Sequence, residues 1–177
     1  MVEKEITCPG CGLARLRQGE SFYTGGYNAS PECWKLFTQI LGRSFGDGML
    51  YGQVHQLAVD AYAAQHAGGN HGYKSAVVHL AGLHLVLERG EPPTSLAPLL
   101  QRLAGALETW PHLPPPDVNC PVTVQNVVAA KSPEDHANQV WQWADSVWRS
   151  WVSHHEFIRE FVARHVGTRK TEPETEA

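Results

Sequence analysis

Residues 28–46 read NASPECWKLFTQILGRSFG and predict a helix whose two ends are both marked. Ser30 can cap the first turn, and Pro31 suits the first helical position, where no backbone N–H is needed. Glu32 then places a negative charge at the positive end of the helix dipole. Gly46 interrupts the apolar pattern at the other end. A segment with these signals favours a protein built mainly from helices.

The same start signal, Ser-Pro-Glu, recurs at residues 132–134 and predicts a long helix that runs unbroken to about Val166. Three further helices are expected, over about residues 49–67, 73–89 and 95–110. The second of these is apolar on almost every side, which predicts that it is the most buried helix. No run alternates with a period of two for long enough to predict a sheet. The sequence therefore predicts an all-α helical bundle of five or more helices with an N-terminal zinc-knuckle loop module.

The length and composition are those of one globular domain. The chain has 177 residues, of which 42% are hydrophobic and 18% are charged, and these values are too apolar for a disordered protein. We expect a single helical domain over residues 1–167 that includes the zinc module at about residues 1–33. The charged residues 168–177 are expected to form a disordered tail.

The charge balance argues against several classes of partner. Fourteen Lys and Arg residues and 18 Asp and Glu residues give a net charge of -4, with no basic stripe, so no nucleic-acid partner is expected. The N-terminus has no apolar signal segment, and no run approaches the length of a membrane span. We therefore expect no membrane partner and a cytoplasmic location, where the four cysteines would be thiolates and not disulfides.

Cys8 and Cys11 lie in the sequence CPGC, which has two interpretations. A redox pair of this kind needs a strand before it and a helix directly after it. Residues 12–28 are instead glycine-rich and aperiodic, so a metal site fits better, since CxxCG is the spacing of a zinc knuckle. Cys33, in the first turn of the 28–46 helix, supplies a third thiolate. Its alternative role is that of a small buried core residue.

Zinc takes four ligands, so the three cysteines need a fourth. If the 49–67 helix returns antiparallel to the first, its C-terminal end lies beside the knuckle, and His66 is the ligand-competent residue there. Cys120 on a proline-rich linker and His71 on the next loop are the alternatives. The predicted cofactor is zinc, and its predicted ligands are Cys8, Cys11, Cys33 and His66.

A second set of polar residues lies within apolar helices. Asp60 and His79 belong to the two middle helices, and the pair His154 and His155 follows a tryptophan-rich segment. Buried carboxylates and imidazoles need partners. One interpretation is that these four candidate catalytic residues face a shared cavity, where they bind a divalent metal or act as acid and base. The alternative is that they are core residues with local hydrogen bonds.

Five motifs carry a resemblance to a known family: CPGCG, YNASPECW, HQLAVDAYAAQH, VHLAGLHLVLERG and SVWRSWVSHHEFIR. Together they resemble an uncharacterised bacterial family known as a domain of unknown function, over about residues 8–165. This resemblance implies no activity. A fainter likeness is to DinB-like metal-dependent bundles, which place three histidines from separate helices on one ion. The chain lacks their H-x-x-x-H pair because His154 and His155 are adjacent, so this likeness is an analogy of fold.

Two functions are compatible with these patterns. The first is a metal-dependent hydrolase or transferase that acts on a small-molecule substrate in a His/Asp pocket inside the bundle. The second is a non-enzymatic, zinc-stabilised binding or scaffold protein that contacts a protein partner through its tryptophan-rich segment. The two differ in metal content, since the enzyme would hold metal beyond the zinc of the cysteine site.

Overall fold

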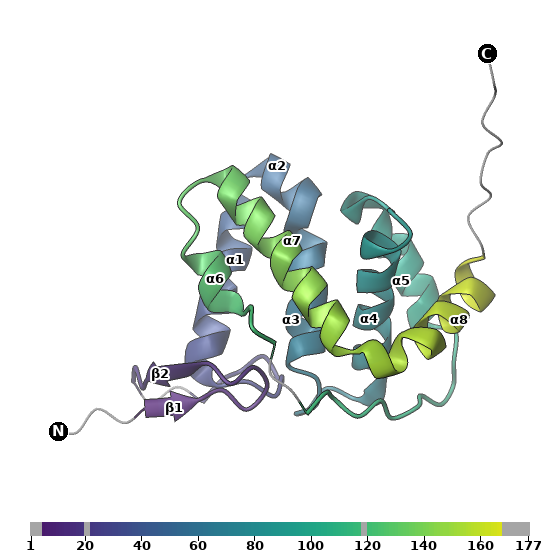
Figure 1. Ribbon diagram of the computed structural model, residues 1–177, viewed down its shortest axis with the longest axis horizontal. Coiled ribbons are helices and arrows are strands. Elements are labelled where there is room, and N and C mark those ends of the chain that lie inside the picture. Colours follow the sequence, from purple (N-terminus) through teal and green to yellow (C-terminus); the bar gives the residue numbers. More distant parts are fainter. Residues whose placement is uncertain (1–4, 20–21, 118–119, 168–177) are drawn as a thin grey trace, which may run out of the picture.

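The computed structural model describes residues 5–19, 22–117 and 120–167, and these form a helical bundle with a small N-terminal hairpin (Figure 1). The predicted all-α fold class is confirmed. The predicted tail at residues 168–177 lies outside the described residues. In chain order the elements are β1 (Glu5–Thr7), β2 (Ala14–Leu16), α1 (Pro31–Gly46), α2 (Gly48–Leu50), a π-helical turn (Tyr51–His55), α3 (Gln56–Gln65), α4 (Tyr73–Leu87), a 3-10 turn (Pro93–Ser95), α5 (Leu96–Ala104), α6 (Val124–Val128), α7 (Pro133–Ser150), a 3-10 turn (Val152–His154) and α8 (His155–Val166).

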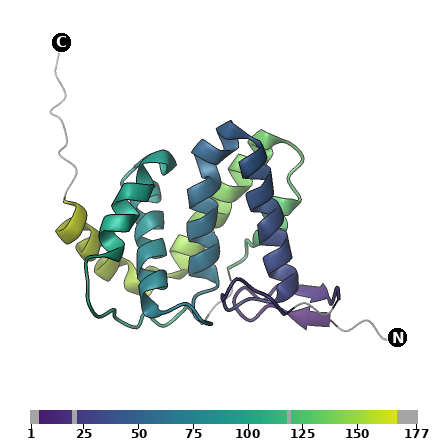
Figure 2. The ribbon, with the colours of Figure 1, turned by 180° about the vertical axis from the view of Figure 1, so that it is seen from behind.

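Helix α1 begins as its sequence predicts. The hydroxyl of Ser30 accepts a hydrogen bond from the backbone N–H of Cys33 at 3.1 Å, and Pro31 occupies the first turn. Seen from behind, α1, α3 and α4 lie side by side, with the hairpin at the foot of α1 (Figure 2). The N-terminal end of α1 is therefore next to the hairpin.

The predicted 49–67 helix is continuous in direction but not uniform. A π-helical turn at Tyr51–His55 separates α2 from α3, and such turns occur often at functional sites. Helix α3 ends at Gln65 and is followed by its C-cap His66, after which Gly68 and Gly69 have φ angles of 103° and 66°. These left-handed conformations favour glycine and reverse the chain toward α4.

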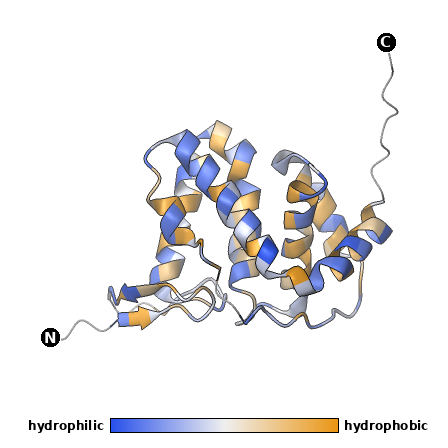
Figure 3. Ribbon diagram, in the orientation of Figure 1, coloured by the Kyte–Doolittle hydropathy of each residue, from blue (hydrophilic) through white to orange (hydrophobic). Residues whose placement is uncertain are grey.

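Helix α4 is the buried centre of the bundle, as its apolar sequence predicts. It contacts α3, α5, α7 and α8, and the ribbons of α4 and α5 are largely hydrophobic (Figure 3). Gly82 allows α4 to approach α3 closely, because a Cβ atom there would overlap the carboxylate of Asp60. Ten of its residues are buried: Ala76, Val77, Val78, Leu80, Ala81, Gly82, Leu83, His84, Leu85 and Val86.

The prediction of one unbroken helix from residue 133 to residue 166 is wrong. Helix α7 ends at Ser150, and a 3-10 turn separates it from α8. The carbonyl of Trp148 accepts hydrogen bonds from the backbone N–H of Trp151 at 3.0 Å and from Nε2 of His155 at 2.8 Å. These contacts replace the regular helical bond to this carbonyl. The change of direction brings α8 onto α4 and α5.

Two shorter segments also differ from the sequence prediction. The helix expected over residues 95–110 ends at Ala104, since the N–H of Gly105 bonds to the carbonyl of Arg102 in a tight turn. A short helix not predicted from sequence, α6, begins at a reciprocal capping box between Thr123 and Asn126. In the described part of the chain, no helix is both long and apolar enough to cross a bilayer.

Candidate metal centre

The N-terminal hairpin presents two cysteines in its turn. Strand β1 pairs antiparallel with β2, and Cys8 follows β1 directly. The N–H of Cys8 bonds to the carbonyl of Leu13 at 2.9 Å, and the N–H of Gly12 bonds to the carbonyl of Cys8 at 2.9 Å. Gly12 has a φ angle of 73°, which a side chain would disfavour. This tight turn points both thiols toward the helices.

Gly10 explains why this turn can lie so close to the bundle. A Cβ atom at this position would overlap the carbonyl oxygen of Asn28 and would lie 2.7 Å from Cδ2 of His66. The absence of a side chain therefore lets the knuckle turn pack directly against the end of α3.

Cys33 lies at the N-terminal end of α1 and is fully buried. Its thiol sulfur is 3.8 Å from that of Cys11. The N–H of Ser30, which precedes the helix, donates to the sulfur of Cys8 at 3.4 Å. Both the helix dipole and this N–H favour negative charge on sulfur, as thiolate ligands require.

His66 approaches the cysteines from the C-terminal end of α3. Its Nδ1–H donates to the carbonyl of Tyr62 at 2.9 Å, and its ring stacks on the ring of Tyr62 at 4.1 Å. Nε2 lies 3.3 Å from the sulfur of Cys33. A backbone carbonyl that accepts one ring N–H leaves the other nitrogen free as a ligand, which is the usual arrangement at metal sites.

The four potential ligand atoms converge. One atom from each of Cys8, Cys11, Cys33 and His66 lies within 4.8 Å of the other three, and all four residues are buried. We call this group the cysteine cluster. A tetrahedral zinc ion with bonds of about 2.3 Å to sulfur would hold two sulfurs about 3.8 Å apart. The Cys11–Cys33 sulfur separation of 3.8 Å has this value and is far too long for a disulfide.

The pKa shifts of the cysteines are compatible with a bound cation. Hydrogen bonds from the thiols of Cys11 and Cys33 hold the pKa of Cys8 well below its usual range. Contacts with Cys11 and Cys8, together with burial, raise the pKa of Cys33 well above its usual range. One negative charge is thus favoured within the group, and a second is opposed. Three thiolates and one imidazole can coexist there only around a positive ion.

The donor set fits a soft or borderline divalent metal. Thiolate and imidazole ligands in a tetrahedral arrangement suit zinc. The exposed fractions of the four residues run from 0% for Cys33 and His66 to 3% for Cys11. Structural zinc sites are enclosed in this way by four protein ligands, whereas catalytic zinc keeps one position open to water or substrate.

The two alternative fourth ligands make other contacts. The thiol of Cys120 donates to the hydroxyl of Ser150 at 3.2 Å. Nε2 of His71 bonds to the carbonyl of Gly25 at 3.0 Å, and its ring stacks on Tyr27 at 4.0 Å. Of the three histidine and cysteine candidates, His66 is therefore the one that faces the knuckle.

Asp60 and His79 form a close pair between α3 and α4. Oδ1 of Asp60 lies 2.7 Å from Nδ1 of His79 and 2.9 Å from Nε2 of Gln56. The Asp60 side chain is fully buried, whereas that of His79 is 19% exposed. Burial raises the pKa of Asp60, and its contact with His79 offsets part of this shift. Oδ2 of Asp60 has no hydrogen-bond partner among the described residues.

The structure does not bring His154 and His155 to this pair. His154 bonds to the carbonyl of Pro114 at 2.9 Å, and His155 bonds to the carbonyl of Trp148 while its ring stacks on that tryptophan at 3.8 Å. Within the described ranges, the cysteine cluster is the one group of three or more potential ligands close enough to hold a metal. The expected convergence of Asp60, His79, His154 and His155 on one metal is therefore not found, because the break after α7 turns both histidines toward backbone carbonyls.

Sequence reasoning missed a polar network around Glu88. Its Oε1 accepts from Nε1 of Trp148 at 3.0 Å, and its Oε2 accepts from Nδ1 of His84 at 2.9 Å. Arg159 donates to both oxygens, at 2.5 and 2.7 Å. These contacts, led by that from Arg159, lower the pKa of Glu88 to about 2. We call these four residues the Glu88 network; the i, i+4 spacing of His84 and Glu88 was its one local signal.

The chain belongs to a family of unknown function (DUF5946), whose match covers residues 6–152 and thus most of its length. The matched range includes all four residues of the cysteine cluster and the Asp60–His79 pair, and it ends before His154. No curated protein and no solved structure matches the chain. The resemblance to an uncharacterised family is confirmed, and the comparisons carry no activity to this protein.

Proposed function

We propose that the protein is a zinc-stabilised helical-bundle protein of the binding or scaffold type, in which one structural zinc is held by Cys8, Cys11, Cys33 and His66. The observation that carries this proposal is the convergence of four buried ligand atoms within 4.8 Å of one another. When bound, the ion would neutralise the thiolates and tie the hairpin to α1 and α3. Catalytic chemistry at this ion is disfavoured because the four residues enclose it.

Metal content tests this proposal directly. Protein purified without an affinity tag should contain one zinc per chain by elemental analysis, and His66→Ala should lower that value to well below one. Cys120→Ser is the matched control, since Cys120 contacts Ser150 and lies outside the cluster. Zinc that remains stoichiometric in His66→Ala, or that is lost in Cys120→Ser, would contradict the proposed ligand set.

The Asp60–His79 pair supports a second candidate function, that of a hydrolase or transferase. A buried carboxylate that accepts from Nδ1 leaves Nε2 of the imidazole as a base, and His79 is partly exposed. In this role His79 would accept a proton from a nucleophile or water, and Asp60 would orient the ring. The pair needs no metal for this chemistry.

Activated esters provide the test of this second candidate. The zinc-loaded protein should hydrolyse nitrophenyl acetate or nitrophenyl phosphate, and His79→Ala should remove that activity while zinc content stays at one per chain. His154→Ala is the control, since His154 contacts the carbonyl of Pro114 instead. Absence of turnover on both esters, or turnover that His79→Ala leaves unchanged, would favour the non-enzymatic function.

A further inference from the structure

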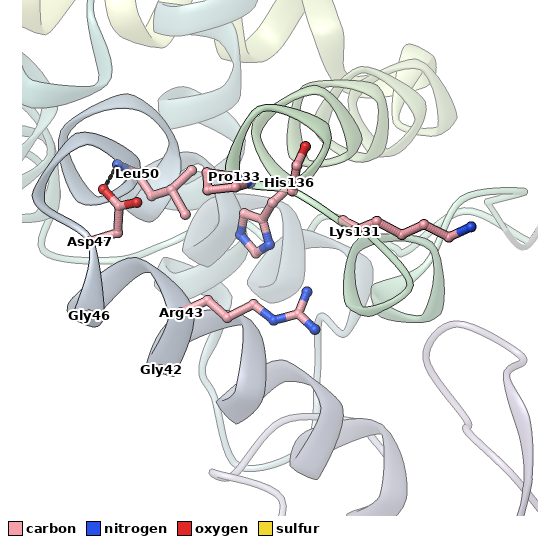
Figure 4. Close-up of a pocket in the computed structure, with 10 residues that line it drawn as sticks. Gly42, Arg43, Gly46, Asp47, Leu50, Lys131, Pro133 and His136 are labelled. Atoms are coloured by element: carbon pink, nitrogen blue, oxygen red, sulfur yellow. Dashed lines mark hydrogen bonds between the residues drawn. The ribbon is translucent and has the colours of Figure 1, made fainter.

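A further polar site lies at the other end of α1 from the cysteine cluster, where α1 ends and α7 begins. A cavity of about 440 Å³ is lined there by Arg43 and Asp47 on one side and by Lys131 and His136 on the other (Figure 4). None of these residues belongs to the cysteine cluster or the Asp60–His79 pair. The site is therefore independent of both functions proposed above.

His136 is the most unusual residue of this cavity. It is only 2% exposed, and neither of its ring nitrogens has a hydrogen-bond partner among the described residues. Burial lowers the pKa of His136 and the charge of Arg43 lowers it further, while the charge of Asp135 offsets part of this shift. A neutral imidazole still has one N–H donor and one acceptor, and leaving these unpaired is costly. The ring extends from α7 toward the guanidinium of Arg43 (Figure 4).

Arg43 supplies a fixed positive charge beside this imidazole. Its guanidinium donates to the carbonyls of Val127 and Val128, at 3.4 and 2.9 Å, near the C-terminal end of α6. A guanidinium has five N–H donors, so these two bonds hold it in place and leave further donors available. Among the described residues, no carboxylate forms an ion pair with Arg43.

The remaining charges at the cavity favour an anion. Asp47 is the acidic residue of the lining, but its Oδ1 accepts from the N–H groups of Met49 and Leu50 and caps α2. Lys131 adds a second positive charge and extends outward from the rim (Figure 4). The N-terminal end of the 18-residue helix α7 also borders the cavity, at Ser132 and Pro133.

We propose that this cavity binds a small oxyanion, namely the phosphate or carboxylate group of a small molecule, between the guanidinium of Arg43 and the ring of His136. The imidazole N–H and the free guanidinium N–H groups would donate to the anion oxygens, as charge-assisted hydrogen bonds require. The bound anion would satisfy a donor that has no protein partner and would balance the charge of Arg43. Lys131 at the rim of the cavity would add a second positive charge near the bound anion.

Inorganic phosphate and acetate are the probes that test this site. The zinc-loaded full chain should bind one of them saturably at one site per chain when chloride keeps the ionic strength constant. In two-dimensional NMR the ring resonances of His136 should shift along the same binding curve. The probe that binds with the higher affinity, phosphate or acetate, identifies the class of oxyanion. A response that does not saturate with either probe, or that leaves the His136 resonances unmoved, overturns the proposal.

Variants of the two central residues locate the bound anion. Arg43→Gln should weaken binding about tenfold or more, since one charge-assisted contact is lost, and His136→Phe should also weaken it. Arg149→Gln removes the same charge from an exposed position at the far end of α7 and should leave affinity unchanged. Equal weakening by Arg149→Gln would indicate nonspecific charge screening and would overturn the site.

Two further measurements keep this test independent of folding and of the zinc proposal. If Arg43→Gln proves unfolded by circular dichroism, Lys131→Gln at the exposed rim replaces it and should weaken binding by a smaller factor. Zinc content should remain at one per chain in all folded variants. A variant that loses anion binding but keeps its zinc therefore has a defect in this cavity alone. The proposal is contradicted if anion binding is retained both in His136→Phe and in the folded charge variant, Arg43→Gln or Lys131→Gln.

Discussion

The cysteine cluster and the Glu88 network both join helices that are distant in sequence, but they differ in how their charges are compensated. Both oxygens of Glu88 accept hydrogen bonds from the protein, from His84, Trp148 and Arg159. In the cysteine cluster, three sulfurs and one imidazole nitrogen lie within 4.8 Å of one another. The network is complete within the chain, whereas the geometry of the cluster is one that could hold a metal ion.

This difference separates a polar group that stabilises the fold by itself from one that depends on an added component. Bidentate arginine–carboxylate contacts are strong because they are charged and geometrically fixed. Once one of the converging thiols is ionised, its charge opposes the ionisation of the others, and a divalent ion bound to all of them would remove this opposition. Buried polar atoms without a protein partner thus indicate where a ligand or metal could bind.

The largest expected effect is the loss of the cysteine cluster. Cys11→Ser should release zinc and lower the free energy of unfolding by more than about 4 kcal/mol, because metal binding and folding are coupled at such sites. Proteolysis should then begin in the hairpin that carries Cys11. The measurements are elemental analysis, thermal unfolding and limited proteolysis. If Cys11→Ser kept full stability and stoichiometric zinc, the cysteine cluster would not differ from the Glu88 network in its dependence on a bound metal.

A second, intermediate effect is expected at Asp60, which has one partnered and one unpartnered oxygen. Gly82→Ala would place a Cβ atom against Asp60 and should destabilise the protein by about 1–3 kcal/mol. Gly42→Ala is the control, since nothing lies within 4 Å of a Cβ atom there, and it should stabilise α1 by about 0.5–1 kcal/mol. Thermal unfolding of both variants measures the difference; equal effects would contradict the close packing of α3 on α4.

The Glu88 network should show its contribution in the acid range. The folded pKa of Glu88 is about 2, below the ordinary value of 4.5, so the unfolded chain binds a proton first as pH falls. The stabilisation is present above pH 4.5 and is lost as pH falls through this window toward 2. Because Glu88 is partly exposed, its contribution is discounted for solvent screening to about 1 kcal/mol.

Comparison with Glu88→Gln isolates this contribution from acid release of the metal. Both proteins would release a bound zinc ion at low pH, since protons compete for the thiolates. The stability difference between them should therefore be about 1 kcal/mol near neutral pH and should shrink between pH 4.5 and 2. A difference that stays constant over this range in urea titrations would contradict the network as described.

The smallest expected effect is at His154, which belongs to neither region. His154→Ala removes one exposed hydrogen bond to the carbonyl of Pro114 and should change stability by less than about 1 kcal/mol. Zinc content should be unchanged. A loss of metal in this variant would show that the adjacent histidine pair takes part in metal binding after all, which the structure does not indicate.

Local signals in the sequence determined most of the helices. Ser30 and Pro31 define the start of α1, the apolar run at 73–89 identifies the buried helix, and the CPGC spacing identifies the turn of the candidate metal site. These features depend on neighbouring residues, since helix caps, periodicity and turn chemistry act over a few positions. The sequence also predicted His66 as the fourth ligand, because the lengths of the two helices bring the chain back to the knuckle at this residue. The role of His66 in binding zinc remains a prediction.

Only the tertiary structure decided where the polar side chains meet. At the break after Ser150, His155 bonds to the carbonyl of Trp148 and His154 bonds to that of Pro114, so the histidine pair does not join Asp60 and His79. Contacts between helices depend on crossing geometry and rotation, which residue spacing within one helix does not specify. For the same reason the meeting of Arg43 with His136, and that of Glu88 with Arg159, could be found only once the helices were packed together.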